Sequence, residues 1–451
     1  MLAIYRNSNG EILRTGGRII RSMEGLYTTW EIDELIAQGW IPVATGAELN
    51  ALRTTTSQTM GAGTIWQGTY TTGADKQDVQ VDNIDLTAFE NFSQITSFVG
   101  KYDGNELLIK NFTQNVTLSG HRGGLFDQAD GDADKVVTIV NVRLSGNVST
   151  TQNICGGLMG SMLNADSLID NCIFTGTVTG AARAGGLLGQ NGGTTTNGGT
   201  VSNSQANGTV SGSLSVGGLI GAHQLNAKCI NSNANVNVSA TSTGSGGLIG
   251  TANNSSLTEN CFALGDITTS GQRSGGLIGE MLTGALCKKS YATGNVSTSS
   301  TSALEAYAAG LIGVLINAGT KAEDSYATGN VEATSTGGRI SGCLNLGGGT
   351  NATNCYSTGK VIGSTTSKGG FSALGSGSTI NCYWDKDSSE ITTSVSGQGR
   401  TTLQMKQGTA DSFILPGGGV DGDSLAANAM YTGWSNDVWE FTPDNEYPKL
   451  K

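Results

Sequence analysis

The sequence predicts an all-β chain: a right-handed parallel β-helix (β-solenoid) with short N-terminal helices and an aromatic-rich C-terminal cap. Three observations lead to this prediction. A Gly-Gly-Leu motif returns about every 30 residues, which is typical of a repeat architecture. The chain has 69 glycines but only 4 prolines, and no proline lies between Val43 and Leu415. A second motif, Asn-Cys-Tyr or a close variant, keeps the same period. We therefore divide the chain into an attachment segment (1–39), a solenoid (40–400) and a cap (401–451).

The N-terminal segment, residues 1–39, fits no repeat, and we expect it to attach the chain to a larger body. Asn7–Gly10 separates two short apolar runs, which is typical of a hairpin turn. The stretch 28–39 begins like a capping box and ends at Gly39, and residues 45–52 begin in the same way. These patterns predict two short helices that lie across the first coil.

The Gly-Gly-Leu motif predicts one solenoid coil per period. Its steps vary from 28 to 34 residues, which a solenoid tolerates because one turn can grow a loop without disturbing the next coil. A propeller blade needs about 40–50 residues, and helical repeats need long apolar stripes. We expect glycine at this corner to allow positive φ and close backbone approach, and the following leucine to stack on its equivalent about 4.8 Å away. The second small residue of the motif stands at 124, 157, 186, 218, 247, 276, 310, 342 and 370.

The Asn-Cys-Tyr motif predicts one inward and one outward row of side chains. Five of the eight cysteines share one repeat position, which serine takes at Ser290 and Ser325, so we expect small inward residues and inert thiols. Without a CxxC motif and with two histidines, structural zinc is not expected. The next residue should face outward because strand neighbours alternate. Tyr291, Tyr326 and Tyr356 are therefore candidate ligand-binding residues that could stack on sugar rings; alternatively, the row only covers and stiffens the sheet.

An acidic cluster is the one candidate metal site. Asp127, Asp130, Asp132 and Asp134 lie around Gly131. Alternating carboxylates can wrap a hard cation, so Ca²⁺ is the candidate cofactor, and no other cofactor is expected. The closing glutamate of an EF-hand loop is missing, which leaves a solvated acidic turn as the alternative.

We predict no catalytic residues and expect a protein that is not an enzyme. The sequence has no H-E-x-x-H and no G-x-S-x-G motif, which removes the common metallopeptidase and serine-hydrolase patterns. Two carboxylate pairs, Asp385 with Asp387 and Asp421 with Asp423, could serve a glycosidase if they faced each other across a cleft. A polysaccharide depolymerase therefore stays open as an alternative.

The net charge of −11 disfavours a nucleic-acid partner. No run of about 18 apolar residues occurs, so no membrane span is expected. The first residues lack the apolar core of a signal peptide, so we expect the chain to be made and folded in a cytoplasm.

Several stretches resemble the GLUG-motif β-helix family of bacterial adhesins and phage-encoded surface proteins. The resemblance covers about 40–451 and rests on the two repeated motifs, on Trp40–Leu49, which looks like an entry helix, and on Tyr383-Trp384-Asp385 with the tail Tyr-Pro-Lys-Leu, which looks like a cap. Residues 82–86 and 98–111 are similar to the first coils. The resemblance implies a β-helix without shared catalytic residues. Some members are joined to IgA-cleaving metallopeptidases, whose zinc-binding helix this sequence lacks.

The sequence thus favours a phage tail fibre, spike or other virion appendage that contacts the host cell surface. Its expected partners are a glycan or protein on the host or a neighbouring cell, and other tail proteins bound through residues 1–39. The expected location is the virion, and by analogy with tail spikes we expect a homotrimer. The alternative is a bacterial adhesin, which would be extracellular at the cell surface.

Overall fold

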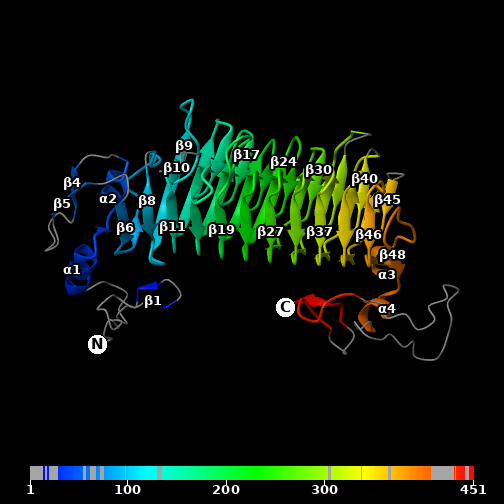
Figure 1. Ribbon diagram of the computed structural model, residues 1–451. Coiled ribbons are helices and arrows are strands. Elements are labelled where there is room, and N and C mark those ends of the chain that lie inside the picture. Colours follow the sequence, from blue (N-terminus) through cyan, green and yellow to red (C-terminus); the bar gives the residue numbers. More distant parts are fainter. Residues whose placement is uncertain are drawn as a thin grey trace. The chain divides into compact units, whose positions relative to one another are not determined.

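The fold is that of a parallel β-solenoid in each of two compact units, seen in a computed structural model. Unit 1 comprises Met1–Gly212 and Leu219–Asn233, and unit 2 comprises Ser213–Gly218 and Ala234–Lys451. The predicted all-β solenoid is confirmed, and within each unit the strands of successive coils lie side by side (Figure 1). The division between the units falls inside the predicted solenoid segment 40–400. The structure describes residues 14–15, 18–19, 29–53, 57–60, 68–71, 76–96, 98–129, 135–302, 306–336, 338–363, 367–407, 431, 433–441 and 446–451.

Two short helices flank the first parallel strand of unit 1, and the prediction of two helices here is confirmed. They are α1 (Thr29–Ala37) and α2 (Gly46–Ala51), with strand β3 (Trp40–Val43) between them. Helix α2 begins with a capping box, in which the Glu48 N–H donates to Thr45 Oγ1 over 3.2 Å and the Thr45 N–H donates to Glu48 Oε2 over 3.0 Å. The hairpin predicted around Asn7–Gly10 lies outside the described residues. Two antiparallel strand pairs are β1 (Arg14–Thr15) with β2 (Arg18–Ile19), and β4 (Ser57–Met60) with β5 (Gly68–Thr71).

The coils of unit 1 build four parallel sheets, which we call A to D. One lap visits them in the chain order A, B, D, C, as β15, β16, β17 and β18 do. Sheet A contains β3, β6 (Lys76–Gln80), β8 (Gly100–Asp103), β11 (Val137–Val140), β15 (Leu168–Asp170), β19 (Thr200–Ser202) and β23 (Lys228–Ile230). Sheet B contains β7 (Ile84–Asp85), β9 (Leu108–Val116), β12 (Arg143–Thr150), β16 (Ile173–Thr179) and β20 (Gln205–Gly212). Sheet C contains β10 (Phe126–Ala129), β14 (Met159–Met162), β18 (Leu188–Asn191) and β22 (Ile220–His223), and sheet D contains β13 (Ile154–Gly156) and β17 (Arg183–Gly185).

Unit 2 has the same four series of strands. Sheet A contains β27 (Leu257–Glu259), β32 (Leu286–Lys288), β37 (Lys321–Glu323), β42 (Asn351–Thr353) and β46 (Ser378–Ile380). Sheet B contains β24 (Asn233–Ala240), β28 (Phe262–Ala263), β33 (Tyr291–Ala292), β38 (Tyr326–Ala327), β43 (Tyr356–Ser357), β47 (Tyr383–Asp385) and β48 (Gln398–Arg400), with a side branch of β29 (Ile267–Thr269), β34 (Val296–Thr298), β39 (Val331–Ala333) and β44 (Val361–Gly363). Sheet C contains β26 (Ile249–Ala252), β31 (Ile278–Leu282), β36 (Ile312–Ile316) and β41 (Leu344–Leu346). Sheet D contains β21 (Val216–Gly217), β25 (Ser245–Gly246), β30 (Arg273–Gly275), β35 (Tyr307–Ala309), β40 (Arg339–Ser341) and β45 (Ser367–Gly369).

The leucines of the Gly-Gly-Leu motif form the predicted inner rows. In unit 1 the Leu187 N–H donates to the Leu219 carbonyl over 3.0 Å, and in unit 2 the Leu248 N–H donates to the Leu277 carbonyl over 2.9 Å. All four side chains are fully buried. Each coil therefore places its leucine against the equivalent leucine of the next coil, and burial of these rows contributes to the apolar stabilisation of the fold.

Two properties were predicted for the glycine of the motif, close backbone approach and a positive φ, and at Gly247 and Gly276 only the first is found. A Cβ on Gly276 would lie 2.0 Å from the Gly310 carbonyl oxygen, and one on Gly247 would lie 2.1 Å from that of Gly276. Close backbone approach therefore excludes a side chain. Neither Gly247 nor Gly276 has a positive φ, so the predicted left-handed conformation was wrong at these positions.

The left-handed corner of each coil belongs to the residue before the cysteine row. Asn171, Asn260 and Asn354 have φ between 50° and 54°, a region that asparagine enters more easily than most residues. After this corner the cysteine or serine points inward as predicted. The Cys261 N–H donates to Ser290 Oγ over 3.1 Å, and Ser290 Oγ donates to the Lys288 carbonyl over 2.8 Å. All eight cysteines are buried and unbridged.

Residues 385–400 lie against the last coil of unit 2, where β47 pairs with β48 and Ser372 forms a bridge with Ser396. Trp384 is buried over Gly370, and its Nε1 donates to the Ile391 carbonyl over 3.0 Å. The Gly370 N–H donates to the Thr393 carbonyl over 3.0 Å. The remaining elements are α3 (Lys386–Ser389), α4 (Thr402–Gln407), β49 (Trp439–Glu440) and β50 (Lys449–Leu450).

Candidate functional site

A column of stacked rings runs along the outer face of sheet B in unit 2. Phe262, Tyr291, Tyr326 and Tyr356 are register partners on four neighbouring strands. Their ring centroids are 5.0, 4.9 and 4.9 Å apart in this order, and the ring planes differ by 7° or less. The column forms because each repeat places an aromatic residue directly after the inward Cys or Ser, and register fixes the spacing.

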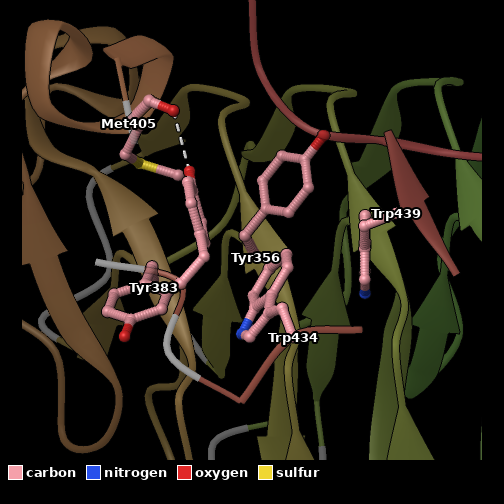
Figure 2. Packing of buried hydrophobic residues seen from close by; sticks show 6 residues of the cluster. Tyr356, Tyr383, Met405, Trp434 and Trp439 are labelled. Atoms are coloured by element: carbon pink, nitrogen blue, oxygen red, sulfur yellow. Dashed lines mark hydrogen bonds between the residues drawn. The ribbon is translucent and has the colours of Figure 1, made fainter. Parts of the chain in front are cut away.

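The C-terminal residues pack against this column. We call Tyr431, residues 433–441 and residues 446–451 the C-terminal strap. Trp434 and Trp439 lie beside Tyr356, with ring centroids 6.2 and 6.0 Å from it (Figure 2). The Tyr356 hydroxyl donates to the Pro448 carbonyl over 2.7 Å. The strap therefore covers one end of the column, where its buried rings form a single apolar cluster with those of sheet B.

Polar contacts fix the strap to the coils. Trp439 Nε1 donates to Asp324 Oδ1 and Trp434 Nε1 donates to the Asn381 carbonyl, both over 3.2 Å. Tyr431 donates from its hydroxyl to the Met405 carbonyl over 2.8 Å, the bond dashed in Figure 2. These bonds pair the polar atoms of buried rings, which would otherwise lose their bonds to water.

Asp385 is the polar centre of this attachment. Its carboxylate is fully buried and accepts the N–H groups of Asp387 and Ser388 over 2.8 and 3.1 Å. It also accepts the hydroxyls of Thr402 and Tyr447. Asp387 in turn accepts the Thr402 N–H over 2.9 Å. Both carboxylates thus serve as hydrogen-bond acceptors that join α3, α4 and the strap, which argues against the glycosidase role considered for this pair. The other pair, Asp421 and Asp423, lies outside the described residues.

Two hollows lie between the strap and the ring column. We call the first, of about 320 Å³, the lysine hollow; it is lined by Thr293, Tyr326, Thr328, Tyr356, Lys406, Glu446, Tyr447 and Lys449. The second, of about 420 Å³, is lined by Asn260, Cys261, Phe262, Lys289, Tyr291, Asp437, Val438, Leu450 and Lys451. The strap thus converts the outer face of sheet B, which would be flat alone, into two concave surfaces.

Charge is concentrated at the rim of the lysine hollow. Lys406 Nζ lies 4.9 Å from the centroid of the Tyr447 ring, a cation–π distance. Lys449 pairs with Glu446, and this pair holds the pKa of Glu446 below its usual value. The described lining therefore carries two ammonium groups and one carboxylate.

The tyrosines of the site stay neutral at physiological pH. Burial raises the pKa of Tyr326 and raises that of the enclosed Tyr356 well above its usual value. Burial, followed by the hydrogen bond to Asp385, raises the pKa of Tyr447 to about 12. The hydroxyl groups therefore remain donors, and the rings add no negative charge to the hollow.

The structure separates the three tyrosines predicted as glycan ligands. Tyr291 and Tyr326 are half-buried and line different hollows. Tyr356 is only 1% exposed because the strap covers it, so the expectation of an open ring face is wrong for this residue. Covering of part of the sheet, the alternative considered from sequence, describes the Tyr356 end of the column.

The predicted calcium site is only partly described. Asp127 lies on β10, where the Arg122 N–H donates to its Oδ1 over 3.0 Å and Arg122 Nη1 lies 3.7 Å away. Burial raises the pKa of this carboxyl, against the lowering effect of Arg122. Asp127 thus faces a cation of the chain itself. Asp130, Asp132 and Asp134 lie outside the described residues, and among the residues that are described no group of three or more possible metal ligands occurs.

Comparison with known proteins adds little. No family model and no curated protein matches this chain. A solved structure described as a "putative immunoglobulin A1 protease" from Bacteroides ovatus is 14% identical, with 91% of each chain covered and a TM-score of 0.40. A likeness at this level carries no argument about activity or partners.

Among the described residues, no helix has the length and apolarity needed to cross a membrane.

Proposed function

We propose that this chain is a non-enzymatic receptor-binding protein that holds a cell-surface glycan between its ring column and its C-terminal strap, as a part of a phage tail. The observation that carries glycan binding is the lysine hollow, where half-buried Tyr326 lies among hydroxyl and ammonium groups. Aromatic rings stack on the apolar faces of sugars, and such polar groups suit their hydroxyls. The placement in a phage tail rests on the sequence resemblance alone.

The proposal is tested by measuring how the fluorescently labelled protein binds to intact bacterial cells and to their purified surface polysaccharides. We expect saturable binding that Tyr326→Leu weakens strongly and that Tyr307→Leu, a change on sheet D, leaves intact. Binding of both variants at the wild-type level would refute the site. Release of oligosaccharides during the incubation would replace the proposal with a depolymerase.

Immunogold labelling then separates the two locations. The proposal expects label on phage tails. Label on the surface of uninfected bacteria would assign the chain to the alternative, a bacterial adhesin.

A further inference from the structure

We propose that the lysine hollow selects a carboxylated sugar residue, such as a uronic acid, and that Lys406 binds its carboxylate. This inference rests on the proposed glycan binding and adds the class of sugar. The first step of the argument is size. A hollow of about 320 Å³ lies at the small end of the range for ligand pockets, which suits one or two sugar residues.

The second step concerns the neutral part of the ligand. Tyr326 supplies an aromatic surface between Tyr291 and Tyr356, and Tyr447 supplies another. Thr328 follows Tyr326 by two residues on the same coil and adds a hydroxyl to the lining. Aromatic and hydroxyl groups of this kind fit the ring and the hydroxyls of any hexose, so they explain sugar binding without explaining a choice among sugars.

The third step is the charge. Glu446 forms its ion pair with Lys449 and attracts Lys406 only from beyond ion-pair distance. Lys406 faces the Tyr447 ring, and neither a carboxylate within ion-pair distance nor a hydrogen-bond acceptor is found for its ammonium among the described residues. The buried carboxylate of Asp385 lies outside the lining and accepts hydrogen bonds from two hydroxyls and two N–H groups. The lining itself, with two ammonium groups and one carboxylate, therefore has one positive charge in excess, and a carboxylate on the ligand would complement it.

The experiment compares digalacturonate with galactobiose, which differ in their carboxylates, by isothermal titration calorimetry at low salt. We expect the wild type to bind the acidic disaccharide about tenfold more tightly, as expected for one hydrogen bond between charged groups. Lys406→Gln should abolish this preference while keeping the binding of galactobiose, and Lys406→Arg should retain it. Lys321→Gln, on sheet A of the same unit, is the matched control and should behave as the wild type.

The outcomes separate the two proposals. Equal affinity of the wild type for both disaccharides, or an unchanged preference in Lys406→Gln, would overturn the acidic selectivity while leaving glycan binding in place. If Tyr326→Leu loses the binding of both disaccharides while the lysine variants keep that of galactobiose, the result supports the Tyr326 ring as the surface that both sugars contact. If the wild type binds neither disaccharide, the acidic-sugar proposal fails, and the cell-binding assay then decides the proposed function separately.

Discussion

Asparagine is the commonest residue at the corner before the inward cysteine or serine. Asparagine takes the left-handed conformation before the inward cysteine or serine, and Lys289 and Asp324 take it in two coils of unit 2. The Asn354 amide donates to Asp324 Oδ1 over 3.0 Å, so the corner residues also bond along the stack. A left-handed non-glycine residue costs free energy, and these bonds between coils offset part of that cost.

At the same scale, we predict that Gly276→Ala is destabilising by steric overlap alone. The new methyl group would lie 2.0 Å from the Gly310 carbonyl oxygen, and relief requires the coils to separate. We expect a loss of about 1–3 kcal/mol, as for other overpacked positions, measured by urea unfolding. Gly348→Ala is the control because nothing lies within 4 Å of its added Cβ. Equal stability of the two variants would contradict this account of the motif.

At the scale of elements, the strap gives equivalent tyrosines different environments. Tyr291 and Tyr356 occupy the same position in their repeats and stack on the same column. One is half-buried and the other is 1% exposed, because only the second lies under Trp434 and Trp439. The contact surface of the column is therefore set by a segment about a hundred residues away in sequence, as the separation of 92 residues between Tyr356 and Pro448 shows.

We predict that alkaline pH releases the strap. The pKa of Tyr447 is raised from 10.0 to about 12 in the folded state, so the neutral form is favoured there. The resulting stabilisation is fully present below pH 10 and is lost as the pH rises through about 12. Near-ultraviolet circular dichroism and tyrosinate absorbance should show a joint transition in this range. Tyr447→Phe should move it upward, because burial raises the pKa values of Tyr356 and Tyr431 well above their usual value; a transition at pH 10 in both proteins would contradict the prediction.

The sequence predicted the elements better than their tertiary contacts. The period, the inner leucine rows and the inward Cys/Ser row follow from local pattern, because a solenoid repeats each local environment once per lap. Asn171 and its equivalents could have been recognised as left-handed corners, since asparagine tolerates that region. The surface against which Trp434 and Trp439 pack could not be predicted from the sequence. An aromatic-rich tail can pack equally well on the open end of the last coil or on an outward-facing column of rings. Tyr356 was consequently expected to be open.

At the scale of the whole molecule, both units repeat one lap, with strands in the order A, B, D, C. Within unit 1 the lap also aligns outer polar residues. Thr177 and Thr209 are register partners on β16 and β20, and their Oγ1 atoms are 3.3 Å apart although 32 residues separate them. Within unit 2 the same register brings the rings of Tyr291 and Tyr326 together. The ring column and both hollows therefore form only if successive coils stack in register.

Cross-linking of introduced cysteines tests this register most directly. In Thr177→Cys/Thr209→Cys, a short bifunctional thiol reagent should join the two exposed sites, since register partners on neighbouring strands lie about 4.8 Å apart. The eight native cysteines are buried and should not compete. In Thr177→Cys/Thr195→Cys the residues are closer in sequence but the second lies in the loop after β18, and we expect no link. Mass spectrometry of the digests should find the first cross-link alone. A link in the second pair without one in the first would contradict the stacking of laps.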